Sequence, residues 1–200
     1  MSDAPDQAVQ LSVVTPATWI TLDLDPATRN DSIARVVQQR IGSGPNEESR
    51  RIELRAAFER VMAEAEGQDA VHAALLSDVI EGVPVAASLI VSLREGQSAS
   101  ASAGLNPAVV AQGLRQALDG KGAAEVRELP LGPAVQVRQR VLAQVPVGEG
   151  PTAEVETVQW FVPLPDGRHL ALLSFSTPNV GLAEPFGKLF DAIAATLSWS

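Results

Sequence analysis

The side chains that could carry acid–base or nucleophilic chemistry are few in this sequence. It contains two histidines, His72 and His169, and no cysteine. A Ser-His-Asp triad or a histidine metal site would need one of these two residues, and neither lies in a recognisable ligand spacing. The lack of cysteine excludes disulfides, thiolate nucleophiles and cysteine-based metal sites. We therefore interpret both histidines as structural and predict no catalytic residue, no metal site and no cofactor.

Two acidic residues and two glycine-rich stretches have simpler interpretations than catalysis. Asp23 and Asp25 could form a paired-acid site, but a carboxylate directly before Pro26 is typical of a helix start, and Asp23 is expected to face solvent. The glycines at positions 42–45 and 120–122 match neither a phosphate-binding loop nor a dinucleotide-binding loop. We predict that they end helices.

The best candidate for a ligand-facing surface is a polar strip on one predicted strand. Gln136, Arg138 and Arg140 are spaced two apart, so their side chains should share one face of a sheet, with valines on the other face. Such a cationic strip could hold an acidic partner or an anion, and the alternative is a solvated face. Trp199, near the C-terminus, either anchors the last helix or belongs to an exposed contact.

Composition limits the classes of partner. The net charge of -9 disfavours binding to nucleic acid and to anionic membranes, which require clustered cations. No apolar run is long enough to span a bilayer, and the acidic, polar N-terminus does not resemble a signal peptide. We expect a cytoplasmic protein whose partner is another protein, with a homodimer as one possibility.

The last quarter of the chain has the strongest local pattern. Residues 155–164 alternate with a period of two and are rich in β-branched and aromatic side chains, which predicts a strand. Pro165-Asp166-Gly167 supplies a turn, and residues 169–177 form the returning strand of a hairpin. Apolar residues at three- and four-residue spacing predict a helix over 181–197 that lies across the sheet, with Asn179 as a possible N-cap.

The remaining elements complete an α+β fold. Strands are predicted at 11–14, 19–24, 83–93, 126–129 and 134–145, and helices at 26–41, 46–66 and 106–118. Residues 70–80 fit either a strand or a continuation of the preceding helix, and we favour the strand. Short connections predict antiparallel pairing, so we expect residues 11–200 to form one domain, a single twisted antiparallel sheet with helices packed on it. Residues 1–10 are predicted to be a flexible arm.

The closing hairpin and helix carry a family resemblance. Residues 159–178, followed by Phe186 and the helix at 189–197, resemble the final hairpin and helix of PsbP/Mog1-like proteins and of small α+β proteins of actinobacteria. The resemblance implies a non-enzymatic binding or accessory module. We therefore expect an adaptor-like or chaperone-like protein, and the alternative is a small-molecule-binding protein or an unusual hydrolase with a cavity between sheet and helices.

Overall fold

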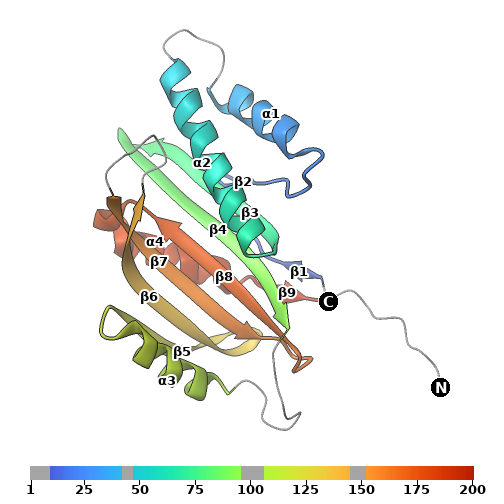
Figure 1. The fold of residues 1–200 in the computed structure, drawn as a ribbon, viewed down its shortest axis with the longest axis vertical. Coiled ribbons are helices and arrows are strands. Elements are labelled where there is room, and N and C mark those ends of the chain that lie inside the picture. The colour runs from blue at the N-terminus through green and yellow to red at the C-terminus, as the bar shows by residue number, and fades with distance from the viewer. Residues whose placement is uncertain (1–9, 42–46, 96–105, 145–151) are drawn as a thin grey trace, which may run out of the picture.

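An antiparallel sheet of seven strands forms the centre of the computed structural model, which describes residues 10–41, 47–95, 106–144 and 152–200 (Figure 1). The strand order is β2-β3-β4-β8-β7-β6-β5, and every neighbouring pair is antiparallel. The strands are β2 (Ile20–Thr21), β3 (Ala70–Ile80), β4 (Val83–Glu95), β5 (Gly122–Leu129), β6 (Gly132–Gln144), β7 (Thr152–Pro163) and β8 (His169–Thr177). The α+β fold class predicted from the sequence is confirmed.

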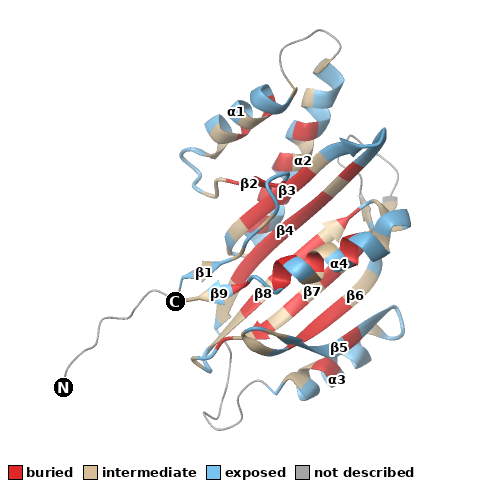
Figure 2. Ribbon diagram, turned by 180° about the vertical axis from the view of Figure 1, so that it is seen from behind, coloured by how far each residue is buried: buried red, intermediate tan, exposed pale blue. Residues whose placement is uncertain are grey.

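Helices cover the two faces of this sheet unequally. They are α1 (Arg29–Ile41), α2 (Glu48–Gly67), α3 (Pro107–Leu118) and α4 (Ala183–Ala194). Helices α2 and α3 lie on one face, over opposite ends of the strand order, and α1 packs beside α2 (Figure 1). Helix α4 lies alone on the other face, across β7 and β8 (Figure 2). The central strands are therefore covered on the α4 side and open between α2 and α3 on the other.

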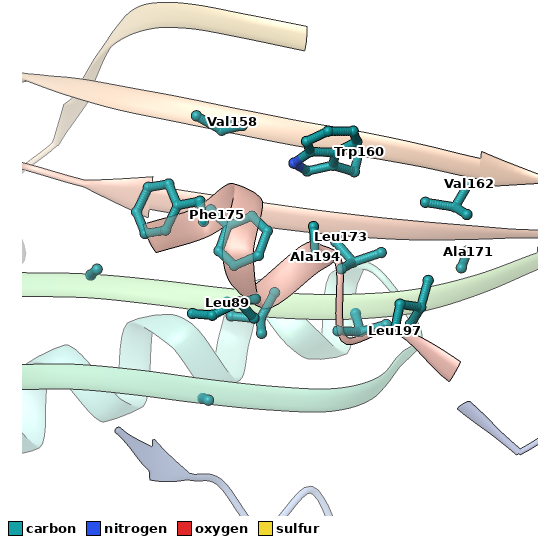
Figure 3. Close-up of a cluster of buried hydrophobic side chains, with 14 of the residues drawn as sticks. Leu89, Val158, Trp160, Val162, Ala171, Leu173, Phe175, Ala194 and Leu197 are labelled. Carbon is teal, nitrogen blue, oxygen red and sulfur yellow. The ribbon is translucent and has the colours of Figure 1, made fainter. Parts of the chain in front are cut away.

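The main core lies between α4 and the sheet. Alternate residues of β4, β7 and β8 point towards the helix, including Leu89, Trp160 and Leu173 (Figure 3). Phe190 of α4 is fully buried and stacks on Phe175, with ring centroids 4.7 Å apart. Burial of this apolar stripe is what holds α4 on the sheet, since a short helix gains most of its stability from packing.

Two smaller cores hold the helices on the opposite face. Phe58 and other apolar residues of α2 pack with α1 and with Leu75 and Ile90 of the sheet. Under α3, Val135 and Val137 are buried, as their alternation predicted. Asn106 caps α3 through a hydrogen bond from the backbone N–H of Ala108, 3.0 Å long.

The strand interpretation of residues 70–80 is confirmed, whereas the start of α1 differs from the prediction. The helix begins at Arg29, because residues 26–28 form a turn. Within this turn the Asp25 carboxylate accepts the N–H of Ala27, and the Asp23 carboxylate accepts the hydroxyl of Thr28. The hydrogen bond from Thr28, together with one from the Asp25 N–H, lowers the pKa of Asp23. The two acids therefore have local structural partners.

The end of the chain also differs from the prediction. Asn179 does not cap α4: its side chain accepts the N–H of Ala86 and donates to the carbonyl of Pro84, so it continues the β8 ladder along β4. A 3₁₀ turn, η2 (Val180–Leu182), precedes α4. The helix ends at Ala194 rather than Leu197, because β9 (Ser198–Trp199) pairs with β1 (Leu11–Ser12). The predicted arm lies outside the described residues except for Gln10, whose backbone pairs with Ser200.

Candidate functional site

Polar side chains occupy the centre of the sheet face that lies between α2 and α3. Ser88 of β4 is opposite Ser176 of β8, which is opposite Thr157 of β7; in the next row, Ser174 is opposite Gln159. Directly paired residues share a face, and Ser88 also pairs with Leu75, which packs against α2. Among the described helices, α2 and α3 flank this centre. Thr157, Gln159 and Ser176 are half-buried, whereas Ser88 and Ser174 are largely buried, so the polar centre is only partly accessible to solvent.

Two hydroxyls on this face are buried without a partner. Ser92 is fully buried and Ser174 is 8% exposed, and neither side-chain oxygen has a hydrogen-bond partner among the described residues. The neighbouring serines satisfy each other, with Ser88 Oγ 2.7 Å from Ser176 Oγ. A buried polar group without a partner costs about 1–3 kcal/mol. The unpartnered Ser174 hydroxyl carries this energetic cost, and Ser174 lines a hollow in the surface.

Three connected hollows run along α2, and together we call them the α2 groove. The hairpin hollow, of about 630 Å³, lies between the β3–β4 hairpin and the α1–α2 pair; the middle hollow has about 70 Å³ and the serine hollow about 40 Å³. The first two share Ala57, Ala86 and Pro178 in their walls. The last two share Glu64, Ser88 and Ser176. The shared walls make the hollows one path from the hairpin to the centre of the sheet.

The charges at the inner end of the α2 groove come from one face of α2. Glu64 lines both the middle and the serine hollow, and Arg60, one turn earlier, lines the middle hollow. Both residues are exposed by surface area, yet the protein around their charged groups partly displaces water. This desolvation raises the pKa of Glu64 despite a hydrogen bond from Gln68, and it lowers the pKa of Arg60. Neither side chain forms an ion pair among the described residues. Both charges face the groove with only partial compensation.

The outer end of the groove has a mixed lining. Val79 on the β3–β4 hairpin is 46% exposed and lines the hairpin hollow together with the apolar residues Leu54 and Pro84. The same hollow is also lined by charged residues of both signs, namely Arg40, Arg50, Glu53 and Asp78. The groove therefore leads from a mixed apolar and charged end to a polar end that carries Glu64.

The predicted cationic strip lies on the opposite face, beside α4. Gln136 is 3% exposed and donates to Asp191 of α4 at 2.6 Å, so the alternative of a solvated face does not hold for this residue. Arg138 lies against Gly187 of α4 and donates to the Ala183 carbonyl. Arg140 is exposed and pairs with the largely buried Glu156, 3.0 Å away. Much of the strip thus has partners within the chain, and its contact with another protein stays a prediction.

The other residues singled out from the sequence are also partly buried or in contact with other parts of the chain. Trp199 is half-buried and pairs with Leu11 in the short β1–β9 ladder. His169 Nδ1 lies 2.5 Å from the Asp166 carboxylate within the β7–β8 turn. His72 is half-buried, and burial lowers its pKa. In the part of the chain that the structure describes, no serine is hydrogen-bonded to either histidine.

The α2 groove was missed by sequence reasoning, although a signal was present. Ser88 and Ser92 in β4, and Ser174 and Ser176 in β8, repeat at even spacing within strands whose other face is apolar. Such alternation marks a polar face. The pairing that brings these serines together joins residues 88 positions apart, which only the fold reveals.

The described residues carry no metal cluster and no membrane-spanning helix, and the chain has few recognisable relatives. Within the described ranges, no three metal-ligating side chains cluster, and no helix combines the length and apolarity needed to cross a bilayer. No family model matches the chain, and no curated protein matches it. A solved structure, the crystal structure of LpqN involved in cell envelope biogenesis of Mycobacterium tuberculosis, covers 96% of this chain and 84% of that chain at 12% identity and a TM-score of 0.47. A likeness at this level assigns the chain neither a family nor a function.

Proposed function

We propose that the protein is a non-enzymatic protein-interaction module that binds an extended segment of a partner in the α2 groove. One observation carries the proposal: the polar centre of the sheet is left partly accessible beside α2, and the unpartnered hydroxyl of Ser174 lies in its wall. The hairpin hollow extends the same surface outward, past Leu54, Val79 and Pro84. Such a groove provides apolar and charged contacts at one end and hydrogen-bond partners at the other, as peptide-binding sites do.

The dimensions of the groove fit a short peptide. Pro84 lines the hairpin hollow and Ser88 the serine hollow, and four residues of strand span about 13 Å. An extended segment of about four or five residues therefore reaches from the hairpin tip to the serines. The PsbP/Mog1-like resemblance and the cytoplasmic location stay predictions, and the proposal depends on neither.

A selection from a random peptide library tests this function. Twelve-residue peptides displayed on phage are selected on the wild-type protein, and the Kd of enriched peptides is then measured on variants. Gln159→Trp fills the open face, and Arg140→Trp places the same bulk on the opposite face. Thermal melting checks that both variants fold. We expect Gln159→Trp to abolish binding and Arg140→Trp to leave it unchanged. Failure to enrich peptides, or loss of binding only in Arg140→Trp, would overturn the proposal.

A second function is favoured by the size of the hairpin hollow. Its 630 Å³ lies within the range of about 300–1,000 Å³ typical of small-molecule sites. Native mass spectrometry of protein purified gently from its host separates the two proposals. A stoichiometric small ligand that Ser77→Trp prevents from binding would support the small-molecule site, because Ser77 lines this hollow and is only half-buried.

A further inference from the structure

The inner end of the α2 groove has the chemistry of a site for a positively charged group. The serine hollow is lined by Glu64, by Phe175 and by the neutral polar residues Ser88, Thr157, Gln159, Ser174 and Ser176. Among the residues that the structure describes, no lysine, arginine or histidine lines it. A carboxylate surrounded by hydroxyl and amide oxygens offers several acceptors and one negative charge.

The acceptors in this hollow are incompletely used. Glu64 accepts one hydrogen bond, from the Gln68 amide at 3.1 Å, and has no ion pair among the described residues. Ser174 is more than nine-tenths buried, and its hydroxyl has no hydrogen-bond partner within the described part of the chain. An ammonium group carries three N–H donors and no acceptor, so it matches a site that supplies a carboxylate and free hydroxyl oxygens.

The size of the hollow favours an ammonium over a guanidinium. Its volume is about 40 Å³, next to a middle hollow of about 70 Å³ through which a thin aliphatic chain could enter. A lysine ends in a compact point charge on a flexible four-carbon chain, whereas arginine ends in a broad planar fork with five donors. The compact group fits the smaller space.

We propose that the serine hollow is a lysine-accepting subsite: a lysine side chain of the bound partner enters through the middle hollow and places its ammonium between Glu64 and Ser174. This proposal rests on the proposed function and specifies the partner, an extended segment that carries a lysine. The protein's net charge of -9 favours the approach of such a basic segment.

Arg60 and Glu64 allow a test in which two substitutions should change the affinity for lysine in opposite directions. Arg60 lies one turn from Glu64 on α2 and lines the middle hollow, so a bound ammonium is attracted by Glu64 and repelled by Arg60. Removing the negative charge should weaken lysine binding, and removing the positive charge should strengthen it. A site that recognised only shape or neutral hydrogen bonds would respond to neither charge in this way.

The experiment compares peptides from the library selection in which one position is lysine, arginine or norleucine. Affinity is measured by calorimetry on wild type, Glu64→Gln, Arg60→Gln and Ser174→Ala, with Glu59→Gln as the matched control, since Glu59 is an exposed carboxylate of the same helix paired with Arg55. For the lysine peptide we expect Glu64→Gln to weaken binding about fivefold, Arg60→Gln to strengthen it and Glu59→Gln to change it little. The norleucine peptide should be insensitive to Glu64→Gln.

The outcomes separate this inference from the function on which it rests. If selected peptides bind in the groove but Glu64→Gln affects the lysine and norleucine peptides equally, the lysine subsite is refuted and the groove stands. If arginine binds more tightly than lysine, the argument from size is refuted. Loss of affinity caused by unfolding is distinguishable, because Glu64→Gln removes a partly desolvated charge of raised pKa and should not lower the melting temperature at neutral pH.

Discussion

Gly187 of α4 and Arg138 of β6 test whether the cationic strip holds α4 on the sheet. A Cβ added at position 187 would lie 2.5 Å from Nη2 of Arg138 and 3.0 Å from its Cζ, so Gly187→Ala must displace the guanidinium. The displacement breaks the hydrogen bond to the Ala183 carbonyl, 3.3 Å, and the ion pair with Glu156, 3.7 Å. Because the Arg138 side chain is 36% exposed, it can move into solvent without disturbing the backbone.

Two effects of similar size oppose each other in this variant. Replacing glycine by alanine in a helix interior stabilises by about 1 kcal/mol. The lost contacts are long and partly exposed, so together they are worth about 1 kcal/mol. We therefore expect Gly187→Ala to change the free energy of unfolding by less than about 0.5 kcal/mol in the wild type, and to stabilise an Arg138→Ala background by about 1 kcal/mol.

Urea unfolding of the four proteins in this cycle measures the coupling free energy directly. The expected value is about 1 kcal/mol between Gly187 and Arg138. A coupling free energy of zero would refute the placement of Arg138 under α4. Arg138 would then be a solvent-exposed residue available to bind a partner. A loss of more than about 2 kcal/mol in both backgrounds would show that the added methyl group meets rigid structure instead of a movable side chain.

Three further predictions concern the core, the end of the β4–β8 ladder and the β7–β8 turn. Phe190→Ala should cost about 3–5 kcal/mol in urea unfolding, because this fully buried ring stacks on Phe175; a cost below about 1 kcal/mol would contradict the packing of α4. Thr177→Val should cost about 1–3 kcal/mol, since it removes the hydroxyl that donates to the Ala86 carbonyl at 2.7 Å, and an unchanged melting temperature would argue against that bond. Desolvation acts to raise the pKa of Asp166, but hydrogen bonds from His169 and two backbone N–H groups outweigh it and lower the pKa to about 2. The folded pKa lies below the unfolded value, so the stabilisation is present above about pH 4 and is lost as the pH falls towards about 2. Carbon-detected NMR titration should show the Asp166 pKa rising in His169→Ala, and no rise would refute the contribution of His169.

The elements with strong local signals could be predicted from the sequence. The β8 strand, His169–Thr177, begins and ends where turn residues and alternation place it, and the Asn106 cap of α3 follows from a side chain and a proline next to each other in sequence. The α4 boundary at Ala194 could not be predicted, because β9 pairs with β1 from the far end of the chain. Local patterns cannot encode a partner so distant in sequence.

The same limit explains what was missed in the candidate site. Alternation correctly placed Gln136 and Arg138 on one face, but it could not show that α4 would cover them. For the serines, alternation implied a polar face, whereas the groove depends on where α2 and α3 come to rest on the sheet. The face predicted to bind a partner is therefore partly occupied by contacts within the chain. The candidate binding surface, the α2 groove, lies on the other face of the sheet.

The measurement that tests the central claim most directly is chemical-shift mapping of a library-selected peptide on the isotope-labelled protein. The account predicts that the amide shifts concentrate along β4 from Val85 to Ser92, on β8 around Ser174 and on the face of α2 that carries Glu64. Shifts confined to Arg140, Trp199 and the outer surface of α4 would contradict it and would place the binding surface on the opposite face of the sheet.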